Sequence, residues 1–86
     1  MFSATVTVKN KTGLHARPAS QLVELSSKYQ SRIKIVNNSD EIDPKSIISL
    51  LSGGVSQGTT IEVRAEGSDE QDAINDIVAL IESFTE

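Results

Sequence analysis

The one histidine of the chain stands where it could accept a phosphoryl group. His15 precedes a helix that the sequence pattern starts at Ala16, and Arg17 follows two residues later. The first turn of a helix presents backbone N–H groups that have no partner within the helix, and its dipole favours an anion there. An arginine side chain can add a charge-assisted contact to a phosphate. This arrangement predicts a nucleophilic ring nitrogen with a cradle for the group that it carries.

Pro18 suits the same place, because a proline in the first helical turn loses no helical hydrogen bond and stiffens the start of the helix. The alternative is that His15 only caps the helix and that Arg17 is solvated, since both residue types are common on protein surfaces. The whole string of residues 12–19, which reads TGLHARPA, favours the phosphoryl site over this alternative.

Hydrophobic periodicity predicts the elements that must position this site. Apolar and polar residues alternate over 2–8 and 60–66, and shorter strands are expected around Ile33 to Ile35 and at Ile42. Helical spacing predicts one helix from Ala16 to near Lys28 and another that ends at Phe84.

Breakers and caps predict where the helices begin and end. Pro44 forces the helix over residues 47–51 to begin after it, and Gly53 with Gly54 ends that helix. Ser68 or Asp69 is expected to cap the last helix, with Gln71 completing a capping box with Ser68.

The element order is β-α-β-β-α-β-α. The second and third strands are joined too tightly for a crossover, so they must be antiparallel. Three helices need a surface to cover, and one face of a four-stranded sheet provides it. We therefore expect a two-layer α+β fold, with residues 1–86 forming one domain without repeats or linkers.

Composition excludes several classes of protein. There is no cysteine, which excludes disulfides, thiolate metal sites and a cysteine nucleophile. The net charge of −4 argues against a nucleic-acid binder. No apolar run is long enough for a membrane span or a signal peptide, so we expect a cytoplasmic protein. Basic side chains dominate residues 1–36, and acidic side chains dominate residues 65–86. This charge asymmetry either steers a partner toward the basic end or only reflects solvated faces.

The string at residues 12–19 resembles the active-site signature of the HPr family, the histidine-containing phosphocarriers of the bacterial sugar phosphotransferase system. The resemblance covers essentially the whole chain. It continues through Lys45-Ser46-Ile47, Gly54, Gly58 and the last amphipathic helix. It implies an open-faced β-sandwich in which four antiparallel strands are covered on one face by three helices, and it implies a monomer.

The resemblance also implies a reaction. His15 would take a phosphoryl group on Nδ1 from phosphorylated enzyme I, whose own donor is phosphoenolpyruvate, and would pass it to the IIA domain of a sugar permease. Arg17 would steady that group, and the backbone N–H groups of Ala16 and Arg17, beside Pro18, would complete the cradle. No metal and no organic cofactor is implied.

Ser46 matches the regulatory serine of the family, which HPr kinase/phosphorylase modifies in low-GC Gram-positive bacteria and which then serves a catabolite control protein. A phosphate is favoured at the start of the helix that follows Pro44. The alternative is that Ser46 is only an N-cap, a role that serine often fills.

The short helix over residues 47–51 is too apolar to be buried completely, so some of its side chains must be exposed. Ile47, Ile48 and Leu51 then form either a docking patch or scattered surface aliphatics, and we favour the patch. The resemblance assigns these three positions and Ser20 to the surface that meets enzyme I and the IIA domains. The chain departs from the family at Glu24, at the turn of residues 38–41, and at Pro44 and Gly53.

Two hypotheses remain for the function. The first is a phosphoryl carrier that uses His15, and the second is a regulatory binding module that acts mainly through phosphorylated Ser46. Retention of His15 and Arg17 favours the carrier, because a pure regulator does not need the nucleophile. An independent enzyme is not expected, since one histidine without an acid–base pair leaves little machinery for turnover.

Overall fold

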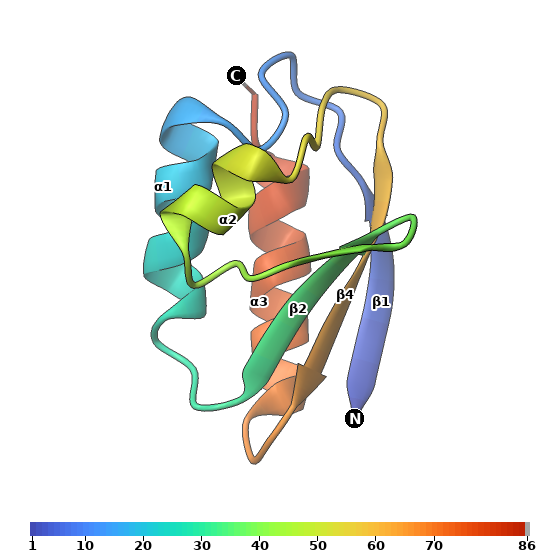
Figure 1. Ribbon diagram of the computed structural model, residues 1–86. Helices are drawn as coiled ribbons and strands as arrows, with labels where there is room; N and C mark the ends of the chain where they lie inside the picture. The colour runs from blue at the N-terminus through green and yellow to red at the C-terminus, as the bar shows by residue number, and fades with distance from the viewer. Residues whose placement is uncertain (86) are drawn as a thin grey trace.

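The computed structural model describes residues 1–85 and contains four strands and three helices in the predicted order. The strands are β1 (Phe2–Thr7), β2 (Arg32–Asn37), β3 (Asp40–Ile42) and β4 (Thr60–Glu66). The helices are α1 (Ala16–Ser26), α2 (Ile47–Ser52) and α3 (Glu70–Ser83). The sheet order is β1-β4-β2-β3, and every pair of neighbours is antiparallel. All three helices lie on one face of this sheet (Figure 1), so the expected open-faced sandwich is confirmed.

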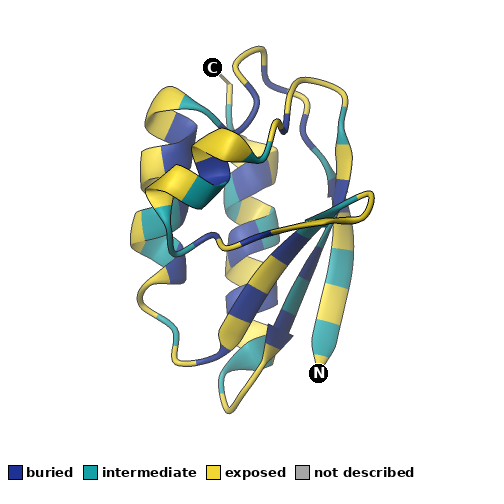
Figure 2. Ribbon diagram, viewed as in Figure 1, coloured by how far each residue is buried: buried dark blue, intermediate teal, exposed yellow. Residues whose placement is uncertain are grey.

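The core lies between the sheet and the helices. Alternate residues of β4 turn inward, and Ile61, Val63 and Ala65 are buried there. Ile74 and Ile77 cover them from α3, which packs against β1 and β4. Figure 2 shows the resulting alternation of buried and exposed positions along the strands. Each fully buried aliphatic side chain stabilises the fold by about 1.5–3 kcal/mol relative to an exposed one.

The end of one helix and the capping of another differ from the expected ones. α1 ends at Ser26 and continues as a turn, in which Lys28 donates its N–H to the carbonyl of Leu25, so the expected end near Lys28 is two residues too late. Asp69 occupies the N-cap position of α3 as expected, but the capping box of Ser68 and Gln71 is wrong. Within residues 1–85 no side chain caps α3, because the Asp69 carboxylate binds the segment before β2 instead.

Within the part of the chain that the structure describes, no helix combines the length and the apolar character that crossing a bilayer requires.

Candidate functional site

His15 is the N-cap residue of α1, and the N-terminal end of this helix lies at the top of the molecule in Figure 1. Its backbone is extended, with φ −125° and ψ 168°, and its side chain is half-buried. Although it occupies the N-cap position, its ring caps no backbone N–H of α1 among residues 1–85. His15 therefore stands beside the first turn of the helix, whose N–H groups have no partner within the helix itself.

The loop that carries His15 is held in place by a close backbone contact with Val55. Gly13 has φ +62°, and a Cβ atom there would lie 2.3 Å from the carbonyl oxygen of Val55. Leu14 donates its N–H to the same oxygen at 3.2 Å. The side chain of Asn10, which is buried, donates to the carbonyl of Gly13 at 2.9 Å. Only glycine fits this approach, which ties the histidine loop to the segment that follows α2.

The chain turns sharply directly after the histidine. Ala16 has φ +56°, which is left-handed backbone that a residue with a Cβ atom rarely adopts. Such a conformation costs on the order of 1–3 kcal/mol and persists only where the surroundings enforce it. The surroundings here are the clamped Gly13 on one side and the buried Pro18 on the other.

The exposed side of the first turn carries the polar groups. Arg17 and Ser20 are exposed, whereas Pro18 and Ala19 are buried. The helix therefore presents the guanidinium and the hydroxyl on the side away from the core. A guanidinium in this position, next to the start of a helix, suits an anion such as a phosphoryl group.

Ser46 is the N-cap of α2, which confirms the N-cap role that the sequence analysis gave as the alternative to a regulatory site. Its Oγ accepts the N–H of Ser49 at 3.3 Å, and its side chain is half-buried. The hydroxyl of Ser49 in turn accepts the N–H of Asp43 at 2.9 Å. These two hydrogen bonds stabilise the start of the short helix, and they give Ser46 a structural role as its N-cap.

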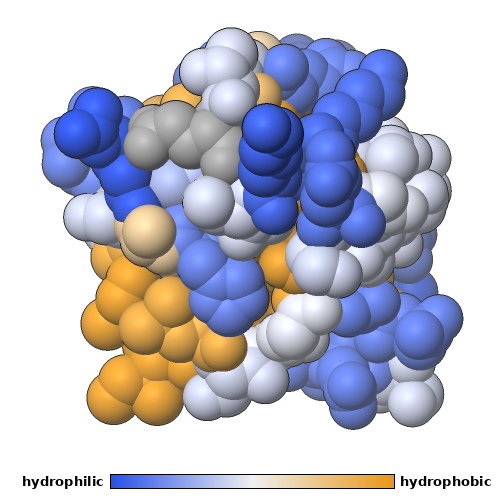
Figure 3. Space-filling view, turned by 90° about the horizontal axis from the view of Figure 1, so that it is seen from above, coloured by the Kyte–Doolittle hydropathy of each residue, from blue (hydrophilic) through white to orange (hydrophobic). Residues whose placement is uncertain are grey.

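The apolar residues of α2 divide between core and solvent. Leu50 is fully buried, whereas Ile47, Ile48 and Leu51 are 41%, 74% and 45% exposed. In the view from above (Figure 3) an apolar area lies at the lower left, where α2 of Figure 1 comes to the front of the molecule. α2 is in contact with α1, and the segment that follows α2 accepts the N–H of Leu14 in the loop that carries His15.

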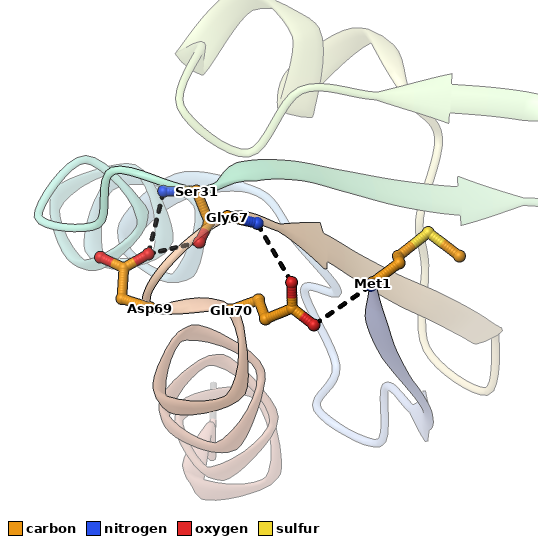
Figure 4. Close-up of polar contacts among 5 residues, drawn as sticks. All are labelled: Met1, Ser31, Gly67, Asp69 and Glu70. Atoms are coloured by element: carbon orange, nitrogen blue, oxygen red, sulfur yellow. Dashed lines mark hydrogen bonds and ion pairs between the residues drawn. The ribbon is translucent and has the colours of Figure 1, made fainter.

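The opposite end of the helical layer is braced by carboxylates (Figure 4). Asp69 accepts the side-chain hydroxyl and the backbone N–H of Ser31, and also the N–H of Gln30 at 2.9 Å. Glu70 accepts the N–H of Gly67 at 3.2 Å. The Ser31 hydroxyl and the Gln30 N–H lower the pKa of Asp69, and the N–H of Gly67 lowers that of Glu70.

Two further side chains complete this brace. The hydroxyl of Tyr29 donates to Asp76 of α3, and this bond, together with the negative charge of the carboxylate, raises the pKa of Tyr29 to about 12. The ammonium of Lys45 donates to the carbonyls of Tyr29 and Ser31, at 2.8 and 2.9 Å. The segment between α1 and β2 is therefore held from both α3 and the chain before α2.

Sequence reasoning missed most of what positions the site. The hydrogen bond from the Asn10 side chain to Gly13 was not predicted, although asparagine is a common turn residue that bonds to nearby backbone groups. The left-handed Ala16 and the role of Val55 have no sequence signal, because both depend on contacts between distant segments. In residues 1–85 no group of three or more histidine or acidic side chains is placed to hold a metal ion.

A family model described as the PTS HPr component phosphorylation site matches residues 2–83 of the chain. The chain belongs to the HPr family. It is 45% identical over 83 residues to the phosphocarrier protein HPr of Mycoplasma pneumoniae, with 95% of this chain and 94% of the relative covered. It is 40% identical over 82 residues to the HPr-like protein Crh of Halalkalibacterium halodurans, with 95% and 98% covered.

Solved structures agree with this placement. The crystal structure of HPr-C-His from Thermoanaerobacter tengcongensis matches with a TM-score of 0.94 and 47% identity, covering 96% of this chain and 93% of that one. A structure described as an HPr dimer from the same organism matches with a TM-score of 0.77, 47% identity, and 96% and 95% covered. The HPr family consists of phosphocarriers, and the matched relatives also include Crh proteins, which are described as connected with catabolite repression.

Proposed function

We propose that this chain carries a phosphoryl group from enzyme I to the IIA domains of sugar permeases, with His15 as the acceptor. The observation that supports it is the half-buried imidazole at an extended N-cap, uncommitted to capping within residues 1–85, in a chain of the HPr family. The lone pair on Nδ1 of His15 forms the new bond to phosphorus as the bond to the donor atom of enzyme I breaks. In the second transfer an acceptor atom of the IIA domain forms its bond to phosphorus as the bond to Nδ1 breaks, which returns the neutral imidazole.

The remaining site residues have supporting roles in this proposal. Arg17 contacts the phosphoryl oxygens, and the backbone at Ala16, Arg17 and Pro18 shapes the cradle. The exposed side chains beside the site form the docking surface for both partners, and they are Ser20, Ile47, Ile48 and Leu51. The carrier acts in the cytoplasm as one domain of residues 1–86 and needs neither metal nor organic cofactor.

Intact-mass spectrometry after incubation with enzyme I and phosphoenolpyruvate tests this proposal. We expect one acid-labile phosphoryl group on the wild type and none on His15→Ala, whose circular dichroism should match that of the wild type. Arg17→Ala should be phosphorylated more slowly, by about tenfold or more, because one charge-assisted hydrogen bond is lost. An unphosphorylated wild type, or a labelled His15→Ala, would contradict the proposal.

A second role for the same chain is regulation through Ser46. It is supported by the similarity to an HPr-like protein Crh and by the place of Ser46 next to the docking surface of α2. A phosphate on Ser46 would add negative charge beside that surface. We propose that HPr kinase/phosphorylase modifies Ser46 and that the modified form binds a catabolite control protein.

Incubation with that kinase and ATP should add an acid-stable phosphoryl group to the wild type and to Ser49→Ala, but not to Ser46→Ala. Ser46→Asp should accept the phosphoryl group from enzyme I more slowly than the wild type. Equal rates for the two proteins would remove the link between Ser46 and docking while leaving the carrier role intact.

A further inference from the structure

The hairpin of β2 and β3 opens into a groove beyond the last residue of β3. The two strands are paired as far as Ile35 and Ile42, and the chain then turns away from β2 toward α2 (Figure 1). A groove of about 380 Å³ lies between the diverging segments, with residues 30–34 on one side and residues 41–43 on the other. None of the residues within 1–85 that line this groove belongs to the proposed phosphoryl site.

Pro44 accounts for the point at which the pairing of β2 and β3 stops. If the register continued, Pro44 would face Ile33, two residues beyond the last pair. The hairpin turn has two residues, so Asn37 bonds to β3, and alternation directs the N–H and C=O groups of Ile35 and Ile33 to the same side. Proline has no N–H with which to complete such a pair. Among residues 1–85 these two backbone groups of Ile33 have no hydrogen-bond partner.

The open backbone groups of Ile33 lie between two positions that are already occupied. Toward the hairpin turn, Ile35 is paired with Ile42. In the other direction, the ammonium of Lys45 donates to the carbonyl of Ser31 at 2.9 Å. The gap in the ladder is therefore one residue long. It offers one donor and one acceptor at the spacing of a β-strand, and the backbone of a single extended residue is complementary to it.

The charge left over in the groove is positive. Both carboxylates that line it are already engaged, because Glu41 forms an ion pair with Lys34 at 3.3 Å and Asp43 accepts the backbone N–H of Lys45 at 2.9 Å. The guanidinium of Arg32 lines the same groove, and within residues 1–85 it has neither a hydrogen-bond partner nor an ion-pair partner. A ligand with a negative charge beside Arg32 therefore complements the groove.

We propose that this groove binds the C-terminal residue of an extended peptide chain, antiparallel to β2 and opposite Ile33. The N–H of that residue donates to the carbonyl of Ile33, and its terminal carboxylate accepts the N–H of Ile33 and the guanidinium of Arg32. The antiparallel direction carries the end of the peptide toward Arg32. A chain end is favoured over an internal segment, because further residues would meet the Lys45 side chain at the carbonyl of Ser31.

The side chain of the bound residue is expected to be apolar. Residues that face one another across an antiparallel ladder point to the same side of the sheet, so this side chain follows that of Ile33, which is buried. On that side the groove is lined by Ile42 and Ser49. A branched aliphatic residue such as valine suits these surroundings. Since one residue makes the whole contact, the binding is weak, with a Kd on the order of 1 mM.

Titration of the isotope-labelled full chain with acetyl-Thr-Val, which ends in a free carboxylate, tests the site by NMR. We expect a saturable shift of the backbone amide resonance of Ile33. Acetyl-Thr-Val-amide lacks the charge and should bind about tenfold more weakly. The same acid with an N-methylated valine lacks the N–H and should leave the Ile33 resonance unmoved. An Ile33 resonance that does not shift with acetyl-Thr-Val would overturn the proposal. So would equal binding of the acid and the amide, or free valine that binds as tightly as acetyl-Thr-Val.

Variants of the groove sharpen the test. Arg32→Ala should weaken binding of acetyl-Thr-Val about tenfold and leave binding of its amide unchanged. Arg64→Ala is the matched control, because Arg64 lies on the neighbouring strand, forms an ion pair with Glu62 at 2.8 Å and does not line this groove. Its affinity for acetyl-Thr-Val should equal that of the wild type. Equal losses in the two variants would overturn the role of Arg32.

Pro44→Val tests the gap itself. This change supplies an N–H opposite Ile33, so the ladder of β2 and β3 can extend by one pair. The amide of Ile33 should then gain protection from hydrogen exchange, binding of acetyl-Thr-Val should be lost, and the circular dichroism should stay that of the wild type. A Pro44→Val protein that binds acetyl-Thr-Val as tightly as the wild type would overturn the assignment of the site to the gap at Ile33.

Discussion

At one end of the helical layer the ring of His15 makes no capping hydrogen bond to α1 within residues 1–85. At the other end the carboxylate of Asp69 accepts three hydrogen bonds from Ser31 and Gln30. Both residues stand at the N-cap position of a helix, α1 and α3. The helix that begins after His15, α1, is in contact with α2, which carries exposed apolar side chains. The same helical position is therefore tied into tertiary structure at the Asp69 end, and under the proposed function it serves a phosphoryl group at the His15 end.

The two ends also differ in backbone strain. Each end has a glycine packed closely on another segment, Gly13 on Val55 and Gly67 on Ser31, where an added Cβ atom would lie 2.3 and 2.6 Å from the nearest atom. The difference is Ala16, a left-handed residue with a side chain at the His15 end, whereas the brace around Ser31 is built from hydrogen bonds and an ion pair. Substitutions at each end should separate these two properties.

The largest effect is expected from Gly13→Ala. The added Cβ atom would lie 2.3 Å from the Val55 oxygen and would occupy left-handed backbone, so the free energy of unfolding should fall by about 3 kcal/mol. Phosphoryl acceptance should fall as well, because the loop that holds His15 must move. Urea denaturation and the intact-mass assay measure the two effects.

Gly54→Ala is the matched control. Gly54 also has a positive φ, of +70°, but no atom lies within 4 Å of its added Cβ position. Only the backbone penalty applies, and the loss should be about 1 kcal/mol with phosphoryl acceptance retained. Equal losses for the two glycines would show that the contact between Gly13 and Val55 does not hold the loop.

At the braced end, Asp69→Asn should lower stability near neutral pH and leave phosphoryl acceptance unchanged. The folded protein lowers the pKa of Asp69, so this carboxylate stabilises the fold fully above its ordinary pKa. That contribution is lost as the pH falls through the lowered value. The wild type should therefore approach the stability of Asp69→Asn in acid, as measured by thermal unfolding across the pH range. Asp72→Asn, at an exposed position of the same helix, should not reproduce this convergence.

The sequence predicted the element order and the exposed residues of α2 because these depend on periodicity within one segment. It did not predict that Asp69 would bind Ser31 instead of capping α3, since that choice depends on how two distant turns meet. His15 was recognisable from the string around it. The conformation of Ala16, which sets where His15 lies, was not recognisable, because it follows from the Gly13 contact.

The smallest effect is expected from Ala16→Gly, which relieves the strain directly after His15. Glycine accepts a φ of +56° without penalty but loses more entropy on folding, so the net gain in stability should be about 1 kcal/mol or less. The loop gains freedom, so phosphoryl acceptance should slow, although less than in Arg17→Ala. The matched control is Ala79→Gly, in the middle of α3, where the same change should cost about 1 kcal/mol. A loss of stability at both positions would show that Ala16 is not strained, and the strain would then no longer distinguish the two ends.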